Sequence, residues 1–249
     1  MSRPRPFRLR AVTLDATGTL LHAPRLGELY REVLRRHGLA VAASAAEVAE
    51  VVRRVWQEMA CVTDGSTDRF STHPEGARGW WRRFAERVAE HLGVENPSPF
   101  ATAELFERFA RPDAWEAYPD AAPALAELRA RGLALAVVAN WDERLPRVLE
   151  GLGLAEPLDA VACSAAVGYE KPDPRAFLAV LARLGVAPEE AAHVGDRRRE
   201  DVEGAAALGM TAVLLDRTGG TADPPEPAAA VVSTLAALPD LLAPVPPGA

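Results

Sequence analysis

Polar side chains stand directly after, or close behind, several apolar strand-like runs, and their types suit phosphoryl chemistry. They are Asp15, Asn140, Lys171 and the pair Asp196 and Asp201. Two carboxylates such as Asp15 and Asp196 repel each other when strand ends bring them together, and a divalent cation with oxygen ligands would neutralise that repulsion. Lys171 adds a positive charge beside them. A nucleophilic carboxylate, a metal clamp and an ammonium group are the parts of phosphoryl transfer, whose barrier falls mainly through positioning and charge neutralisation.

Simpler explanations exist for two of these residues. Asp15 precedes the small residues Ala16 to Thr19, and an acid in such a loop can serve only to cap the next helix. Lys171 is the only lysine among 28 basic residues, and it could have survived by chance. Lysine offers a compact point charge on a flexible stem, whereas arginine carries a wide planar fork. A site that needs a small ammonium group would resist replacement by arginine, so we favour the functional interpretation of Lys171.

The elements that must position these residues follow from periodicity. From residue 118 onward, short apolar runs alternate with helical segments, which predicts a parallel sheet with crossover helices. Sheets of this kind bind ligands at the carboxyl ends of their strands, so the polar residues are expected at one edge. Gly18 permits the turn after the first strand. The predicted strands span residues 8–14, 133–139, 160–163, 192–195 and 211–215, and the predicted helices span 121–131, 144–151, 174–184, 202–208 and 234–241.

The segment between the first strand and residue 110 has helical periodicity throughout. Apolar stripes run through residues 26–34, 48–59 and 80–92, and a further helix is predicted over 102–109. We therefore predict an α/β fold with a Rossmann-like parallel sheet core, formed by residues 1–21 and 116–249, and an inserted helical-bundle cap domain of residues 22–115. Trp80 and Trp81 are adjacent and cannot both face one core, so one of them is expected to face the inter-domain cleft or a partner.

Composition limits the classes of partner. The chain has 249 residues, of which 49% are hydrophobic and 25% charged, and its net charge is -7. An acidic chain argues against nucleic-acid binding as the main function. We expect no export and no membrane span, because no apolar run approaches the roughly 18 residues of a membrane helix. The two cysteines lack metal-ligand spacing. We expect a cytoplasmic protein without a membrane or nucleic-acid partner, as a monomer or a homodimer.

The motifs taken together resemble those of the haloacid dehalogenase superfamily, subfamily I, in which a helical cap is inserted after the first strand. The resemblance covers most of the chain. Each motif alone is a weak signal, but their order along the chain makes the combination strong. The motifs are Asp15 to Thr19, Val137-Val138-Ala139-Asn140, Lys171-Pro172-Asp173, and Gly195-Asp196 with Asp201.

This resemblance implies a role for each motif residue. Asp15 would attack the substrate to form a covalent aspartyl intermediate, and Asp15 and Asp196 would hold Mg²⁺ together with the backbone carbonyl of Thr17. Lys171 would balance charge, and Asp201 would stand behind these groups and orient metal-bound water or Lys171. Most relatives are phosphatases, so the expected partner is a small phosphorylated molecule. The resemblance further implies that Thr19 is catalytic, and that Thr17, Gly18, Asn140 and Lys171 bind substrate.

Two positions depart from the pattern of the family's phosphatases. These enzymes usually carry Asp two positions after the nucleophile, where it protonates the leaving group and later activates water, but here the residue is Thr17. Loss of general acid/base catalysis typically costs about 10² to 10⁴ in rate. The second motif usually places Ser or Thr where Ala139 stands. We expect Asn140 to substitute for that hydrogen bond only in part.

Three functions are therefore weighed. The first is a Mg²⁺-dependent phosphatase that turns over slowly or takes its missing acid from elsewhere, such as the cap. The second is a non-catalytic member that binds a ligand at the old site or a partner through its cap. The third is a 2-haloacid dehalogenase, in which Asp15 displaces halide, but such enzymes replace the metal-binding Gly-Asp pair that Gly195 and Asp196 retain here. We rank them in that order.

Overall fold

The computed structural model describes residues 9–60, 67–94, 97–221 and 224–242. A six-stranded sheet with the order β5-β4-β1-β6-β7-β8 lies at its centre, and every neighbouring pair is parallel. The strand β1 lies between β4 and β6, so the ends of these three strands are neighbours. The predicted α/β class and parallel sheet are confirmed. The strands are β1 (Ala11–Leu14), β4 (Ala134–Ala139), β5 (Ala160–Cys163), β6 (Ala191–Gly195), β7 (Thr211–Leu215) and β8 (Ala230–Val232).

Helices cover both faces of this sheet, which is why its central strands read as continuous apolar runs. On one face, Leu125 and Leu149 pack with Val12 and Leu14 of β1 in a single buried cluster. On the other face, Phe177 packs with Val138 and with residues of the segment after β6. The first face is covered by α5 (Ala121–Ala130), α6 (Leu145–Gly151), η5 (Leu235–Ala237) and α10 (Leu238–Leu241), and the second by α8 (Pro174–Leu184), η4 (Arg198–Glu203) and α9 (Gly204–Ala206).

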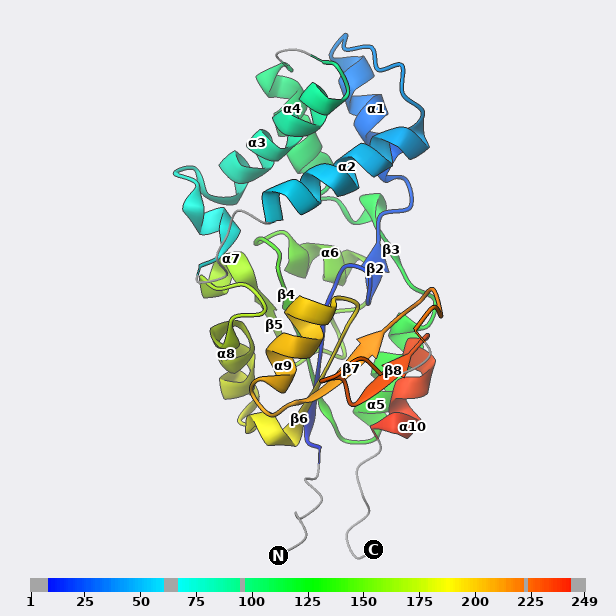
Figure 1. Cartoon of the computed structure of the whole chain (residues 1–249), viewed down its shortest axis with the longest axis vertical. Helices are drawn as coiled ribbons and strands as arrows, with labels where there is room; N and C mark the ends of the chain where they lie inside the picture. Colours follow the sequence, from blue (N-terminus) through cyan, green and yellow to red (C-terminus); the bar gives the residue numbers. More distant parts are fainter. Residues whose placement is uncertain (1–8, 61–66, 95–96, 222–223, 243–249) are drawn as a thin grey trace, which may run out of the picture.

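Four further helices lie together above the carboxyl edge of the sheet (Figure 1). We call them the cap helices, and they have a buried core of their own that includes Phe70 and Phe84. The chain enters and leaves this layer through β2 (Leu21–His22) and β3 (Glu116–Ala117), which pair antiparallel. The domain boundaries placed at 22 and 115 stay a prediction. The cap helices are α1 (Leu26–Arg36), α2 (Ala45–Ala60), α3 (Gly76–His91) and α4 (Pro99–Arg108), with the short turn η1 (Arg69–Thr72) between α2 and α3.

Several boundaries differ from those predicted. The helix expected over residues 202–208 instead begins as a π-helical turn, η4, because the amides of Asp201 and Val202 both donate to the carbonyl of Arg197. The short edge strand β8 was not predicted, and the helix expected over 234–241 is divided into η5 and α10. The first strand is shorter than predicted, and residue 8 of that prediction lies outside the described residues. Short segments (η2 at Pro112–Ala114, α7 at Ser164–Val167 and η3 at Pro188–Glu190) complete the chain.

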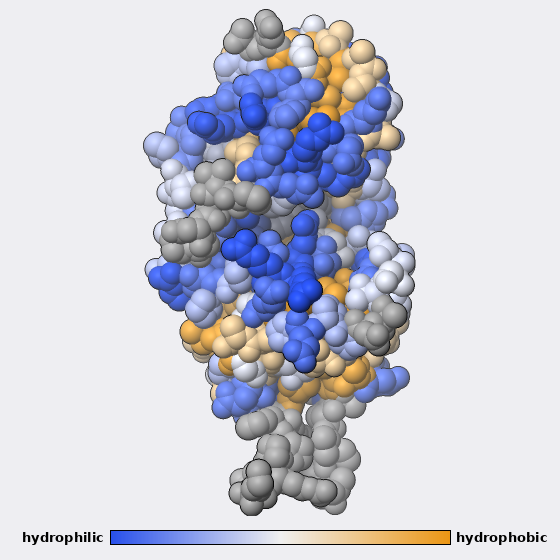
Figure 2. All heavy atoms as spheres, viewed as in Figure 1, coloured by the Kyte–Doolittle hydropathy of each residue, from blue (hydrophilic) through white to orange (hydrophobic). Residues whose placement is uncertain are grey.

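On the face shown in Figure 2, hydrophilic residues cover much of the cap helices and the region just below them, while apolar residues gather at the upper right of the cap and toward the lower end of the molecule. Large apolar side chains that stand out into solvent are few among the described residues, and Phe100 is the most exposed at 77%. Every helix in the described ranges is too short or too polar to cross a lipid bilayer.

Candidate active site

The turn after β1 brings Asp15 and Asp196 together. Asp15 is buried at the end of the strand, where its amide donates to the carbonyl of Val194 on β6 at 2.9 Å. The turn then passes through Gly18 with a φ of 91°. A Cβ atom on Gly18 would lie 2.4 Å from Oδ2 of Asp196, so only glycine lets this turn pass so close to the second carboxylate.

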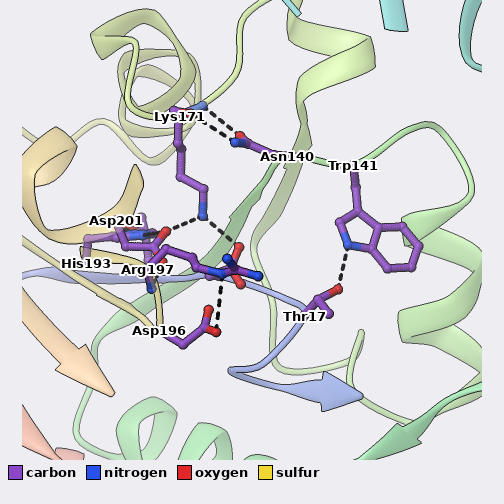
Figure 3. Close-up of polar contacts among 10 residues, drawn as sticks. Thr17, Asn140, Trp141, Lys171, His193, Asp196, Arg197 and Asp201 are labelled. Atoms are coloured by element: carbon purple, nitrogen blue, oxygen red, sulfur yellow. Dashed lines mark hydrogen bonds and ion pairs between the residues drawn. The ribbon is translucent and has the colours of Figure 1, made fainter. Parts of the chain in front are cut away.

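Lys171 joins two acids inside the site (Figure 3). Its Nζ donates to Oδ1 of Asp15 at 2.7 Å and to Oδ1 of Asp201 at 2.6 Å. Burial would lower the pKa of the ammonium group, but the two carboxylates outweigh burial and hold that pKa above its ordinary value. Lys171 is thus a fixed positive charge beside Asp15.

The backbone of Lys171 is held in turn by Asn140. The amide of Lys171 donates to Oδ1 of Asn140 at 2.7 Å, and Nδ2 of Asn140 donates back to the carbonyl of Lys171 at 2.9 Å. Both ends of the Asn140 side chain are therefore engaged by one backbone unit. The end of β4 positions the lysine through this pair of hydrogen bonds, and substrate binding by Asn140 stays a prediction.

Asp201 contacts Lys171, and its implied role of orienting Lys171 or metal-bound water stays a prediction. Besides the lysine, it contacts Nε2 of His193 at 3.2 Å through Oδ1 and accepts from the amide of Arg197 at 2.8 Å through Oδ2. Burial opposes its ionisation, yet Lys171 and His193 outweigh burial and lower the pKa of Asp201. The carboxylate is ionised and fully engaged, which suits a positioning role.

Three carboxylates gather where a cation could sit. Oxygen atoms of Asp15, Asp196 and Asp201 all lie within 4.8 Å of one another. Oδ1 of Asp196 is buried and has no hydrogen-bond partner among the described residues. Burial, with the neighbouring acids, raises the pKa of Asp15 to about 7 and that of Asp196 to about 6, while Lys171 works in the opposite direction on both. Charged acids that are crowded and desolvated in this way fit a hard divalent cation.

The two threonines of the first motif lie in different surroundings. Thr17 is exposed, and its Oγ1 accepts a hydrogen bond from Nε1 of Trp141 at 2.8 Å, on the side of the site away from Lys171 in Figure 3. Thr19 is fully buried, and its Oγ1 lacks a partner among the described residues. The structure therefore places Thr17 at the mouth of the site and Thr19 beneath it, and their predicted roles stay predictions.

A cavity of about 460 Å³ runs from this site into the cap helices. Trp80 is buried in the cap core, whereas Trp81 lines the cavity, so the expected division of the two tryptophans is confirmed. The residues that the site contributes are Asp15, Thr17, Asn140, Trp141, Lys171, Arg197, Glu200 and Asp201. The remaining wall is formed by Leu26, Tyr30, Val52, Arg53, Trp56, Gln57, Arg69, Trp81, Phe84, Ala85, Leu105, Phe106, Phe109, Trp115 and Arg144.

Two buried contacts fasten the cap to the segments that carry the site. Arg69 of η1 donates to Glu170 at 2.7 Å, next to Lys171 in the chain. Two residues beyond Asn140, Asp142 accepts from Nη2 of Arg144 at 2.7 Å and from Nε1 of Trp81 at 2.5 Å. Sequence patterns did not single out Asp142 or Arg144. Their position just after a strand-end motif was the available signal, but their partners lie in the cap and are distant in sequence.

Comparisons with known proteins agree with this geometry. A family model described as haloacid dehalogenase-like hydrolase matches residues 9–209. Haloacid dehalogenase-like hydrolase domain-containing protein 3 of Homo sapiens is 36% identical over 212 residues, which cover 84% of this chain and 82% of the human protein. Phosphoserine phosphatase of Thermus thermophilus is 44% identical over 160 residues, which cover 63% of this chain and 64% of that enzyme.

Two solved structures have a similar fold. A HAD phosphatase from Thermococcus onnurineus has a TM-score of 0.64 at 30% identity, covering 94% of this chain and 98% of that chain. An L-2-haloacid dehalogenase from Xanthobacter autotrophicus has a TM-score of 0.72 at 24% identity, covering 94% and 98%. The second likeness shows the fold alone. The region matched by the family model includes Asp15, Asn140, Lys171, Asp196 and Asp201.

Proposed function

We propose that this chain, which belongs to the haloacid dehalogenase-like hydrolase family, is a magnesium-dependent phosphatase that acts on a small phosphorylated molecule. The observation that carries the proposal is the buried Asp15, which Lys171 holds at 2.7 Å beside an oxygen of Asp196 that has no partner in the described part of the chain. The similarity to phosphoserine phosphatase of Thermus thermophilus supports the same reaction type.

The chemistry begins at Asp15. A carboxylate oxygen of Asp15 attacks phosphorus while the bond from phosphorus to the ester oxygen breaks, and the electron pair leaves with that oxygen, which then takes up a proton. Water hydrolyses the aspartyl phosphate in a second step and restores the carboxylate, releasing inorganic phosphate. Lys171 keeps Asp15 oriented and balances its charge, and Asp201 and Asn140 hold Lys171 in place.

Magnesium would be held by Asp15 and Asp196, together with the carbonyl of Thr17 as the motif resemblance implies. Bound there, it would neutralise the negative charge that gathers between the carboxylates and a phosphoryl group. The chain's own contribution is to crowd and bury the two acids so that their charged forms favour a cation. Asp201 is within reach of the same cluster, but its oxygens already serve Lys171, His193 and Arg197.

A non-catalytic binding protein is the second candidate. It is favoured by the hydroxyl of Thr17, which stands at the mouth of the site and is bonded to Trp141 instead of presenting an acid. A dehalogenase comes third. The likeness to L-2-haloacid dehalogenase from Xanthobacter autotrophicus concerns the fold alone. Displacement of a halide uses one carboxylate, so it gives no reason for the second and third acids of the cluster that includes Asp196.

The test is phosphate release from aryl, sugar and nucleotide phosphates, with Mg²⁺ and with a chelator, by the wild type and Asp15→Asn. The matched control is Asp113→Asn, an exposed acid paired with Arg108 outside the cavity. We expect Mg²⁺-dependent release that Asp15→Asn abolishes and Asp113→Asn preserves, and a phosphorylated Asp15 after rapid acid quench and mass spectrometry. Absence of release from every ester would favour the binding protein, and chloride release from 2-chloropropionate would establish the dehalogenase instead.

A further inference from the structure

The cavity above Asp15 is aromatic along most of its length. Among its described lining residues, eight carry aromatic rings, and they come from all four cap helices and from the segments after α4 and β4. Trp56, Trp81 and Phe84 contact one another, with ring centroids 5.2–6.0 Å apart. Trp115 and Trp141 form a second group at 4.8 Å. We call the part of the cavity lined by Tyr30, Trp56, Trp81, Phe84, Phe106, Phe109, Trp115 and Trp141 the aromatic chamber.

Two arginines of the cavity wall, Arg144 and Arg69, are held in ion pairs, although Nη1 of Arg69 is buried without a hydrogen-bond partner among the described residues. Arg144 is paired with Asp142 and donates to the carbonyl of Phe106 at 2.7 Å. Arg69 is paired with Glu170 and lies 4.7 Å from the ring of Trp56. A sugar or polyol in this chamber would lose water from its hydroxyl groups and find few partners for them, which costs free energy. An aromatic body, in contrast, gains contact with every wall.

In the described wall at the polar end of the cavity, Glu200 carries the one carboxyl group that is neither the proposed nucleophile nor bound to Lys171. The carboxyl groups in its described wall belong to Asp15, Asp201 and Glu200. Asp15 is the proposed nucleophile, and the oxygens of Asp201 are held by Lys171, His193 and the amide of Arg197. The residue at the mouth is Thr17, a neutral hydroxyl that accepts from Trp141. Only Glu200, on η4, could act as an acid, and its role can be tested separately.

Leaving groups differ in how much they need such an acid. A phenol has a pKa of about 10, so a phenolate can depart without prior protonation. A simple alcohol has a pKa closer to that of water, about 15.7, and its alkoxide departs slowly unless an acid assists. The aromatic chamber fits the ring of a phenol, and a site with a hydroxyl in place of an acid suits a leaving group that needs no protonation. Both features therefore favour the phosphate ester of a phenol.

We propose that the substrate is an aryl phosphate, the phosphate ester of a phenol-type hydroxyl, whose ring occupies the aromatic chamber while its phosphate meets Asp15. The proposal rests on the phosphatase function proposed above and specifies its substrate class. In the first step the bond between phosphorus and the aryl oxygen breaks as the bond from Asp15 to phosphorus forms. The electron pair stays on the aryl oxygen as phenolate, which takes a proton from water after release.

Two parts of this proposal, the binding of a ring and the departure of a phenolate, can be tested separately with phenyl phosphate, benzyl phosphate and glycerol 1-phosphate. Phenyl and benzyl phosphate both carry a ring, but only the first releases a phenolate, and glycerol phosphate has neither feature. We expect the wild-type kcat/KM for phenyl phosphate to exceed that for benzyl phosphate by at least about 10²-fold, the contribution typical of a general acid. We compare kcat/KM because it covers only the steps up to the aspartyl phosphate, which is the same intermediate for every ester. Equal kcat/KM values for the two, or a higher value for glycerol phosphate, would overturn the assignment.

Variants at the mouth of the site test the reason for that difference. Thr17→Asp supplies an acid and should raise kcat/KM for benzyl phosphate much more than for phenyl phosphate. Thr17→Asn introduces an amide of the same size as that acid and should not raise it. Glu200→Gln should leave the ratio between the two esters unchanged. If Glu200→Gln instead widens that ratio by about 10²-fold, Glu200 is the acid and the argument from leaving-group basicity is wrong.

Binding provides a readout that does not depend on turnover. With Asp15→Asn, calorimetry should show similar Kd values for phenyl and benzyl phosphate and a Kd about tenfold or more higher for glycerol phosphate, because the rings gain the chamber contacts. Trp56→Ala should weaken only the two ring compounds, and the exposed Arg87→Gln, on the outer side of α3, serves as control. If the wild type cleaves no ester, the phosphatase function fails and the aryl phosphate with it. If the enzyme cleaves esters but binds all three compounds with equal Kd values, the phosphatase function stands and the binding of a ring in the aromatic chamber is wrong.

Discussion

Lys171 is the residue at which size matters as much as charge. Its Nζ lies between Asp15 and Asp201 at 2.7 and 2.6 Å, and the side chain is 2% exposed. Lys171→Arg keeps the positive charge but forces a wider group into a filled site, which typically costs about 1–3 kcal/mol of stability. We expect folding with a lower free energy of unfolding and a loss of phosphate release of at least about 10²-fold, since misplacement of the reacting groups by 1 Å is enough for that.

Urea denaturation and phosphate release measure the two effects. Arg87→Lys, the reverse exchange at an exposed ion pair with Glu90, should change neither. If Lys171→Arg retained full activity, charge alone would suffice at this position, and the survival of a single lysine among 28 basic residues would be a matter of chance.

Gly18 controls how closely the first motif approaches Asp196. An added Cβ would lie 2.4 Å from Oδ2 of Asp196, and the φ of 91° is strained for any L side chain. Gly18→Ala should therefore lower the free energy of unfolding by about 1–2 kcal/mol through backbone strain alone. In addition, it should displace Asp196 and weaken Mg²⁺ binding, which calorimetric titration with Mg²⁺ would detect.

Gly38 offers a matched control for the strain. Its φ is 74°, but an added Cβ would meet no described atom within 4 Å. Gly38→Ala should lose similar stability and leave Mg²⁺ binding intact. Equal Mg²⁺ affinity in Gly18→Ala and Gly38→Ala would show that the close approach to Asp196 has no bearing on the cation.

At the residue scale, the strand ends were enough to find the charged part of the site. Asp15, Lys171, Asp196 and Asp201 follow apolar runs, and parallel strands bring such positions to one edge. The contact between Thr17 and Trp141 could not be predicted, because a side-chain hydrogen bond depends on the local path of two loops. The position of Asp142 after the second motif was a weak signal, because its partners, a neighbouring arginine and a tryptophan of the cap, could not be read from the pattern.

At the element scale, α6 fastens the cap as well as covering the sheet. Arg144, at the start of α6, is paired with the fully buried Asp142 and reaches the carbonyl of Phe106 on α4 at 2.7 Å. Arg144→Met would leave the buried Asp142 with neutral partners only. Breaking one partner of a buried ion pair typically costs about 3–5 kcal/mol, and we expect a loss of this size in the free energy of unfolding.

The comparison is with Arg147→Met, an exposed arginine on the same helix. It should unfold at nearly the wild-type urea concentration. Hydrogen exchange should show faster exchange in α4 for Arg144→Met, because the contact to Phe106 is lost, and no change for Arg147→Met. Wild-type exchange in α4 of the Arg144→Met variant would contradict a role of α6 in holding the cap.

The regular elements were largely predictable, while their irregular ends were not. Alternating strands and helices after residue 118 gave the sheet and its crossover helices, since period and turn residues are local properties. The π-helical turn η4 was not foreseen, because it depends on two amides sharing the carbonyl of Arg197 and on Asp201 reaching back to that residue. β8 has three residues at the sheet edge, too few for a periodic signal.

At the scale of the whole molecule, the cavity exists only where cap and core meet. The core contributes Asp15 and Lys171, and the cap helices contribute most of the aromatic wall. The sequence predicted that the cap helices are inserted after the first strand. It also predicted that one residue of the Trp80–Trp81 pair faces the cleft. The shape of the cavity did not, because its walls come from segments that are far apart along the chain and that meet only through packing.

A bound cation should couple the site to the stability of the entire fold. If Mg²⁺ binds the folded chain alone, a concentration of 100 times its Kd raises the free energy of unfolding by about 2.7 kcal/mol. We expect the urea midpoint of the wild type to rise with Mg²⁺ at pH 8, where Asp15 and Asp196 are ionised even though burial raises the pKa values of both. Asp113→Asn should behave like the wild type.

Asp196→Asn should change which of two proteins, the variant or the wild type, is the more stable, depending on whether Mg²⁺ is present. Without metal, the variant removes one of three crowded acids, so at pH 8 it should be at least as stable as the wild type. With Mg²⁺, it lacks a ligand and should gain little, so the wild type becomes the more stable of the two. Equal stabilisation of both proteins by Mg²⁺ would place the cation elsewhere, and a loss of stability in the metal-free variant would mean that Asp196 supports the fold rather than a cation.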